Sequence, residues 1–184
     1  MDINQDETAD FLFEIGTLRN MRRMQSQVLP ESCDTIASHS FEVAIIGMVI
    51  ARSENADENK VIKMCLFHDL AEARIGDANF IHKFYVRADE EQALRDQVSG
   101  TPIAETVLSI IAEYEAHSTK EAIIAKDADL LDQILVQSAT IKNEADKKLW
   151  NENSAQGLRT QTAKELAKTL SGTNPLSWVY KLAK

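Results

Sequence analysis

Cysteine, proline, glycine and basic residues are all scarce in this sequence of 184 residues. Two cysteines, Cys33 and Cys65, are too few for the disulfide framework of a small exported protein. Three prolines and six glycines leave long stretches without a residue that breaks helices. Lys and Arg number 20 against 29 Asp and Glu, so the net charge is −9, and no basic run occurs. This balance argues against a nucleic-acid polymer as partner.

The sequence also lacks a basic leader and a long apolar run. Residues 1–7 contain no Lys or Arg, unlike the start of a signal peptide. The longest apolar stretch, Val43 to Ala51, is about half of the roughly 20 residues that span a bilayer. We therefore expect a cytoplasmic protein without a membrane segment.

Apolar residues recur at helical spacing in nearly every segment that could be buried, which predicts an all-α fold. The expected helices cover residues 10–25, 38–53, 61–76, 88–98, 118 to beyond 141, 158–170 and 175–182. Thr101 and Pro102 have the form of an N-cap and a first helical residue, and Ser118 to Glu121 has that of a capping box. No repeat or linker divides the chain. We expect one domain over residues 1–184, with the helices of residues 158–184 packed on the core.

Four separated residues have side chains that ligate metals. His39 begins the second expected helix, His68 and Asp69 lie late in the third, and Asp129 lies in the long helix. A bundle that brought them together would offer two imidazoles and two carboxylates, a set that suits Mn, Fe, Co, Ni or Zn. A lone histidine near an apolar helix is more often a hydrogen-bonded core residue, so spacing alone does not decide.

The surrounding segments resemble the HD-domain metal-dependent phosphohydrolases, an all-helical family named for an adjacent His-Asp pair. "IASHSFEVA" resembles the family's first histidine segment, and "CLFHDLAEARIGD" its extended H-D-x-x-E-x-x-x-G-D segment. "AKDADLLDQIL" is similar to the helix with its last aspartate, and "EYEAHSTKEA" to the stretch before it. The likeness covers residues 11–141 and is strongest to the 5′-deoxynucleotidase branch. It implies an HD-type helical bundle.

The resemblance implies a role for each residue of the motif. The metal ligands fall on His39, His68, Asp69 and Asp129, and they imply one divalent ion. Asp127 is the rival of Asp129, but the branch has Lys-x-x-Asp, which Lys126 and Asp129 match. Glu72 falls on the catalytic glutamate, which assists the attack of water on phosphorus.

Two further residues are assigned to the substrate with fewer matching neighbours. Asp77, after Gly76, falls where the family places a residue over the sugar, although it also reads as a turn residue. We count it as both catalytic and substrate-binding. Arg23 falls near the arginine that holds the 5′-phosphate, with Arg19 and Arg22 as alternatives. The family often has a tryptophan after that arginine, whereas this chain has Met24, which puts the substrate contacts in doubt.

The resemblance implies a phosphatase for 2′-deoxyribonucleoside 5′-monophosphates and, by analogy with its members, a homodimer. One alternative keeps the metal and changes the substrate to a guanosine pyrophosphate alarmone, a cyclic nucleotide or another phosphoester. Another is a nucleotide-binding module without activity. His82 and His117 match no ligand motif of the branch, so we expect surface or hydrogen-bonding roles. Cys33 is expected to be a loop thiol and Cys65 a small core residue.

Overall fold

The computed structural model describes residues 4–29 and 32–183, and it confirms the all-α fold because these residues contain no strand. The N-terminal elements are α1 (Gln5–Ile15), the 3₁₀ helices η1 (Gly16–Asn20) and η2 (Met24–Gln27), α2 (Ile36–Glu54), α3 (Glu58–Phe67) and α4 (Glu72–Ile75). The remaining helices are α5 (His82–Tyr85), α6 (Glu90–Val98), α7 (Ala104–Ala116), α8 (Lys120–Thr140), α9 (Glu144–Ala155), α10 (Gln161–Ser171) and α11 (Ser177–Leu182).

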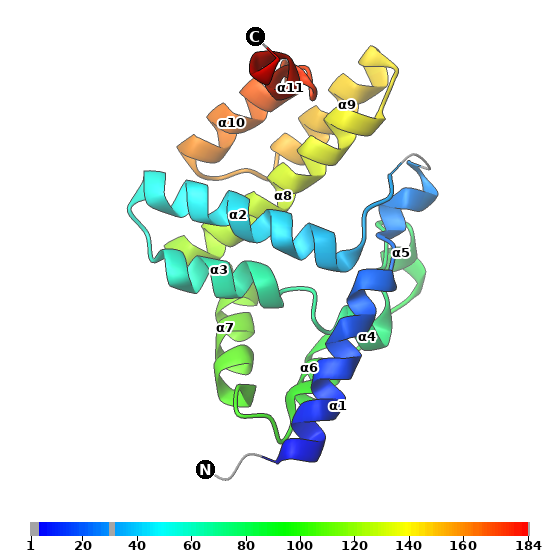
Figure 1. The fold of residues 1–184 in the computed structure, drawn as a ribbon, viewed down its shortest axis with the longest axis vertical. Helices are drawn as coiled ribbons and strands as arrows, with labels where there is room; N and C mark the ends of the chain where they lie inside the picture. Colours follow the sequence, from blue (N-terminus) through cyan, green and yellow to red (C-terminus); the bar gives the residue numbers. More distant parts are fainter. Residues whose placement is uncertain (1–3, 30–31, 184) are drawn as a thin grey trace.

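The main core lies where α2, α3 and α8 pack together. Figure 1 shows α2 crossing the middle of the molecule in front of α8, with α3 and α7 below it and α9 and α10 above. The side chains buried there include Val43, Ile50, Val61, Met64, Cys65, Ile124, Leu131 and Ile134. These residues recur at helical spacing on each helix, which is why the apolar pattern predicted the three helices.

Gly47 allows α2 and α3 to approach closely. A Cβ atom at this position would lie 2.7 Å from the Sγ of Cys65 and 2.9 Å from a methyl of Val61. Both distances are shorter than a normal contact, so a side chain at Gly47 would push the two helices apart. Cys65 is buried and Cys33 is exposed, as expected for a core residue and a loop thiol.

A second apolar cluster joins the N-terminal segment to α4, α6 and α7. Its buried side chains are Phe11, Leu18, Ile36, Leu70, Ala71, Leu94, Val98 and Val107. Leu70 and Ala71 belong to the turn between α3 and α4, so this cluster fixes the chain on both sides of that turn.

The single helix expected over residues 10–25 is wrong. The α-helix ends at Ile15, and the backbone of Arg23 is extended. The N–H of Arg23 donates to the carbonyl of Asp34 at 3.1 Å, and the N–H of Ile36 donates to that of Met21 at 2.9 Å. This short backbone pairing ties Arg23 to the start of α2. Residues 30 and 31 of the expected loop lie outside the described residues.

The helix expected over residues 61–76 is interrupted. Helix α3 ends at Phe67, and α4 begins at Glu72. Between them, bonds from Leu70 to the carbonyl of Phe67 and from Glu72 to that of Asp69 connect residues three apart. The chain is therefore wound more tightly here than an α-helix, which changes the direction of successive side chains.

Two helix starts differ from the expectation. Helix α7 begins at Ala104 with Ile103 as its N-cap, so Thr101 and Pro102 lie in the turn between α6 and α7. The hydroxyl of Thr101 donates to the carbonyl of Val98 at 2.7 Å and does not cap α7. Thr119 is the N-cap of α8 and accepts a hydrogen bond from Ala122. Ser118 therefore does not cap this helix.

The C-terminal third also differs from the expectation. Helix α8 ends at Thr140 and not beyond Ile141, and α9 follows where no helix was expected. Helix α10 buries Ala163 and Ala167 in the main core. The apolar side chains of α11 are exposed, Trp178 by 62% and Leu182 by 79%, so the expected packing on the core is wrong for this helix.

Helix α2 is, among the described helices, the one long and apolar enough to cross a membrane by length and composition. One face of it is buried against α3 and α8 and includes Val43 and Ile50. The helix thus has the packing of a central core helix.

Candidate metal centre

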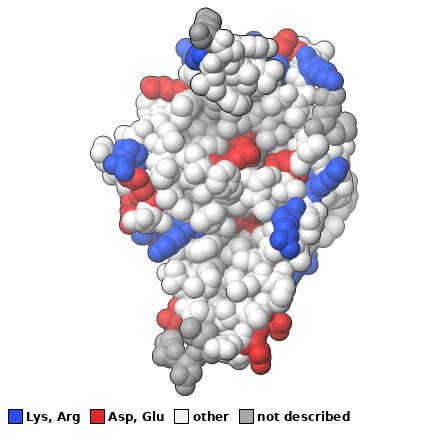
Figure 2. Space-filling model, viewed as in Figure 1, with Lys and Arg blue, Asp and Glu red and all other residues white. Residues whose placement is uncertain are grey.

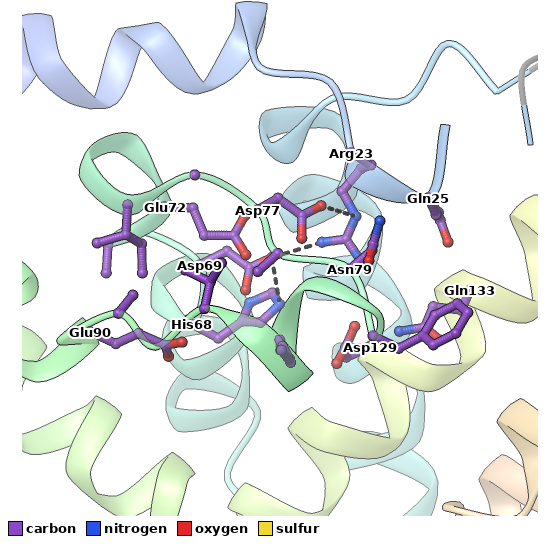
Figure 3. Close-up of a pocket in the computed structure, with 18 of the residues that line it drawn as sticks. Arg23, Gln25, His68, Asp69, Glu72, Asp77, Asn79, Glu90, Asp129 and Gln133 are labelled. Carbon is purple, nitrogen blue, oxygen red and sulfur yellow. Dashed lines mark hydrogen bonds and ion pairs between the residues drawn. The ribbon is translucent and has the colours of Figure 1, made fainter. Parts of the chain in front are cut away.

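Three of the residues with metal-ligating side chains, His39, His68 and Asp129, each place a ligand atom within 4.8 Å of the others, and Asp69 lies beside the two histidines. His39 lies in the first turn of α2, His68 and Asp69 lie in the tight turn after α3, and Asp129 lies in the middle of α8. The Nε2 atoms of His39 and His68 are 3.3 Å apart, and the Oδ2 of Asp69 is 3.3 Å from that of His68. The Oδ1 of Asp129 is 3.4 Å from the Nε2 of His39. Figure 3 shows His68, Asp69 and Asp129 facing the same pocket.

Hydrogen bonds on the far side of each ring orient both imidazoles. The Nδ1–H of His39 donates to Asp132 at 2.6 Å, and that of His68 donates to the carbonyl of Cys65 at 2.8 Å. Each ring therefore turns its Nε2 toward the other and toward the two carboxylates. Such partners are typical of histidines that ligate metals, because they fix the tautomer and the ring orientation.

The donor set fits a divalent cation. Nitrogen and oxygen ligands at about 2.1 Å from one ion lie about 3.0–3.4 Å from each other, close to the separations found here. Burial lowers the pKa of His39, but hydrogen bonds to Asp129 and Asp132 outweigh it and raise the pKa to about 10. In the metal-free site His39 thus favours its protonated form, and a cation bound by these ligand atoms would displace that proton.

The two aspartates considered for the last ligand have different surroundings. Burial raises the pKa of Asp129, but the hydrogen bond with His39 and the charge of Lys126 outweigh it and hold that pKa well below its usual range. Asp127 faces away and accepts hydrogen bonds from the backbone of Arg159 and Thr160 at 2.9 and 2.7 Å. Asp127 therefore fixes the start of α10 and contributes nothing to the cluster.

Arg23 is the arginine that reaches this cluster. Its Nη1 donates to Asp69 at 2.9 Å, and its Nε lies 3.7 Å from Asp77. Burial lowers the pKa of Arg23, but Asp69 and Asp77 outweigh it and raise the pKa above its ordinary value. Arg19 and Arg22 are exposed and do not line the pocket.

Glu72 lines the pocket beside the cluster, one turn after His68. Its Oε2 is buried and has no hydrogen-bond partner among the described residues. Burial raises the pKa of Glu72 to about 9, and the neighbouring charges of Asp69 and Asp77 add to this effect. Glu72 therefore holds a proton at neutral pH in the metal-free site, as a general acid requires.

Asp77 is turned back toward Arg23 by the glycine before it. Gly76 has a φ of +76°, a conformation that residues with a side chain rarely adopt. Asp77 accepts a hydrogen bond from the backbone N–H of Met24 at 2.8 Å. The carboxylate thus joins the end of α4 to the segment with Arg23 and lines the same pocket.

The pocket around these residues has a volume of about 700 Å³, which is within the usual range for small-molecule sites. Figure 2 shows acidic side chains in a hollow near the middle of the face seen in Figure 1, with basic ones at its edge. The carboxylates that line the pocket are Asp69, Glu72, Asp77, Glu90, Glu115 and Asp129. The cations that line the pocket are Arg23, Lys83, Arg87 and Lys126. The pocket thus combines a carboxylate-rich floor with positive charge suited to an anionic ligand.

Sequence reasoning gave no role to two residues that touch the cluster. Asp132, three residues after Asp129 on α8, holds His39, and this spacing was the available signal. Lys126 donates to Asp129 at 2.8 Å. His117 lines the pocket, and its Nδ1 pairs with the carbonyl of Glu115, whereas His82 is half-buried in α5. Neither histidine joins a metal-ligand group among the described residues.

The sequence and the fold are similar to those of known proteins. A family model described as "HD domain" matches residues 15–171. The 5′-deoxynucleotidase HDDC2 of Dictyostelium discoideum is 27% identical over 143 residues, which are 68% of this chain and 73% of that protein. The protein of the same name from Mus musculus is 28% identical over 137 residues, covering 70% and 67%. The crystal structure of PH0347 from Pyrococcus horikoshii OT3 is 25% identical, with a TM-score of 0.70 over 89% of this chain and 98% of that one.

Proposed function

The chain belongs to the HD domain family, and from this premise we propose that it hydrolyses 2′-deoxyribonucleoside 5′-monophosphates to a deoxynucleoside and phosphate. The observation that carries the proposal is the meeting of His39, His68, Asp69 and Asp129 beside the buried Arg23 in a pocket of about 700 Å³. The names of two relatives, both 5′-deoxynucleotidases aligned over about two thirds of their length or more, support the choice of substrate.

His39, His68, Asp69 and Asp129 would hold one divalent ion, of Mn, Fe, Co, Ni or Zn. Such an ion supplies Lewis acidity, which polarises a phosphoryl oxygen and makes water more acidic. Asp132 and the carbonyl of Cys65 keep the two imidazoles in the tautomer that leaves Nε2 free to bind.

Arg23 binds the phosphate, because its guanidinium is the buried cation nearest the ligand cluster. Its Nε is buried without a hydrogen-bond partner among the described residues, so a donor remains available for a phosphate oxygen. Negative charge that develops on the phosphoryl oxygens is stabilised by this guanidinium.

Glu72 moves the protons of the reaction. When the oxygen of water bonds to phosphorus, the bond between phosphorus and the 5′ oxygen breaks, and this oxygen takes the proton of Glu72. The resulting carboxylate accepts the proton that the attacking water loses, so Glu72 ends as it began. The place of Glu72 in the pocket, with a buried Oε2 that has no partner among the described residues, supports this role.

Asp77 contacts the sugar and favours deoxyribose over ribose. The carboxylate lies between the backbone of Met24 and Arg23, two residues beyond the helix that carries Glu72. A ribonucleotide brings an extra 2′-hydroxyl that needs its own space and partner, and such a mismatch costs several kcal/mol, roughly 10²-fold or more in rate.

The test is phosphate release from dAMP and AMP, with and without a chelator. We expect release from dAMP at a far higher rate than from AMP, abolished by the chelator and restored by adding a divalent metal. Asp77→Ala should keep its metal and lose activity or discrimination. Equal rates on the two nucleotides in the wild type, or full activity with chelator, would refute the proposal.

We also propose that the protein acts in the cytoplasm as a homodimer. The apolar side chains of Phe41, Ile45, Met48 and Val49 follow one exposed stripe of α2 and support a contact with a second copy. Sedimentation velocity should give twice the chain mass for the wild type and the chain mass for Ile45→Asp. A monomeric wild type at micromolar concentration would refute the dimer.

A further inference from the structure

The pocket has a neutral side that the proposed reaction does not use. Figure 3 shows the carboxamides Gln25, Asn79 and Gln133 on the side of the site opposite Glu72 and Glu90. All five residues line the pocket. Glu72 and Glu90 thus lie in one part of the pocket, whereas these uncharged hydrogen-bonding groups lie in another part, on the same side as Arg23.

Two of the pocket's carboxamides are already engaged. The Oδ1 of Asn79 accepts from the backbone N–H groups of Ile81 and His82 at 2.9 and 3.0 Å, which fixes the loop before α5. Gln137, one turn beyond Gln133, exchanges hydrogen bonds with the hydroxyl of Ser154. Their roles within the fold are therefore satisfied without a ligand.

Gln25 and Gln133 are different. The Nε2 of Gln25 is buried and has no hydrogen-bond partner among the described residues. An unsatisfied buried amide is costly, which indicates that a ligand or water completes it. The half-buried side chain of Gln133 also makes no hydrogen bond within the described part of the chain, and it lines the pocket. It follows Asp129 by four residues, which is about 6 Å along the same face of α8.

We infer that Gln25 and Gln133 bind the nucleobase of the substrate. A carboxamide presents a donor and an acceptor side by side, and this pair matches the edge of a base, as glutamine does on adenine. A phosphate is bound by donors with positive charge, which Arg23 offers beside these carboxamides, so the two neutral glutamines are left for an uncharged part of the substrate. Trp150 also lines the pocket, from the helix that packs on α8, and adds an aromatic surface for the base. The inference rests on the proposed function and adds the group that distinguishes a nucleotide from a sugar phosphate.

The experiment compares dAMP with 2-deoxyribose 5-phosphate, which has the same sugar and phosphate and no base. The readout is the ratio of kcat/KM for the two compounds in the metal-loaded protein. We expect the wild type to favour dAMP by at least about 10-fold, because two amide contacts are lost with the base. Gln25→Ala and Gln133→Ala should each lower this ratio about 5- to 10-fold.

Gln156→Ala is the matched control, since Gln156 is exposed and does not line the pocket, and it should keep the wild-type ratio. One glutamine variant could lose turnover on both compounds through misfolding. The kcat/KM ratio of the other variant then tests the base site, because Gln25 and Gln133 lie in different helices. Wild-type ratios in both variants, or a wild type that does not distinguish the compounds, refute the base site alone. No release from either compound refutes the proposed function and the base site with it.

Discussion

Asp132 orients the ring of His39 through a hydrogen bond to Nδ1, the ring nitrogen that faces away from the other proposed ligands. Its carboxylate is buried, 2.6 Å from the Nδ1 of His39, and its second oxygen has no partner among the described residues. Asp132→Asn keeps the shape and removes the charge that favours this orientation. We expect the affinity for the metal to fall about 10- to 100-fold, measured by competition with a chromogenic chelator.

The control for this change is Asp127→Asn on the same helix. Asp127 is equally buried but caps the start of α10 through the N–H groups of Arg159 and Thr160. This variant should lose about 1–3 kcal/mol of unfolding free energy and keep its metal affinity. Identical metal affinity in Asp132→Asn and the wild type would show that the carboxylate does not position His39.

The raised pKa of Glu72 predicts that the stability of the chelator-treated protein depends on pH. Its pKa is about 9 when folded and about 4.5 in the unfolded chain, so the folded state holds the proton more tightly. The stabilisation is complete below pH 4.5 and is lost as the pH rises toward 9. Glu72→Gln keeps the neutral form at every pH. It should therefore become more stable than the wild type as the pH rises from 5 to 8, measured by urea unfolding at both pH values.

The same variant separates proton transfer from metal binding. With metal, Glu72→Gln should retain the ion and lose on the order of 10²-fold in kcat. Loss of the ion from Glu72→Gln would instead make Glu72 a ligand. A difference in stability that is the same at pH 5 and pH 8 would contradict the raised pKa.

Residues within one short motif were predictable, and residues that meet through the fold were less so. His68, Asp69, Glu72 and Asp77 share one segment that resembles the family's H-D-x-x-E-x-x-x-G-D motif, so the resemblance implied a common site. Gln25 was not predicted, because its place in the pocket depends on the extended backbone around Arg23. The N–H of Arg23 donates to the carbonyl of Asp34 and is not part of a helix. Apolar periodicity carries no information about such pairing.

At the scale of elements, the interruption between α3 and α4 is what the sequence could not predict. Residues 67–72 contain neither glycine nor proline, and their composition suits a continuous helix. Tertiary contacts favour the tight turn: His68 bonds to the carbonyl of Cys65, Asp69 to Arg23, and Leu70 packs in the second cluster. The gain is that His68 and Asp69 both reach His39, whereas adjacent residues of a helix do not face one point.

The contact between α2 and α3 predicts the effect of Gly47→Ala. Replacing a glycine within a helix gains about 1 kcal/mol. The new methyl would meet Cys65 and Val61 at less than 3 Å, and such overpacking costs about 1–3 kcal/mol. We expect a net loss of stability in urea unfolding and weaker metal binding, because α2 carries His39 and α3 leads to His68.

Gly16→Ala is the matched control for this change. Gly16 has a helical φ of −60°, and an added Cβ would meet no neighbour closer than 3.8 Å. The substitution should leave stability unchanged or raise it. A Gly47→Ala protein as stable as Gly16→Ala would mean that the two helices adjust to the methyl without strain.

For the whole molecule, the proposed metal site joins parts of the chain that pack in different clusters. His39 and Asp129 come from α2 and α8 of the main core. Asp69 precedes Leu70 and Ala71, which belong to the cluster with α1, α6 and α7. An ion held by His39 and Asp129 on one side and by Asp69 on the other would therefore cross-link the two apolar clusters of the fold.

Metal binding should accordingly stabilise the whole chain against unfolding. Free metal at 100 times its Kd adds about 2.7 kcal/mol, because the unfolded chain does not assemble the four ligands. For a domain of this size the gain corresponds to a rise of about 5–10 °C in Tm, measured by thermal unfolding with metal and with chelator. His68→Ala removes one ligand but no part of the main apolar core, so it should fold and show the same Tm in both conditions. A Tm of the wild type that does not respond to any of the five metals would refute the site, and a response retained by His68→Ala would place the ion elsewhere.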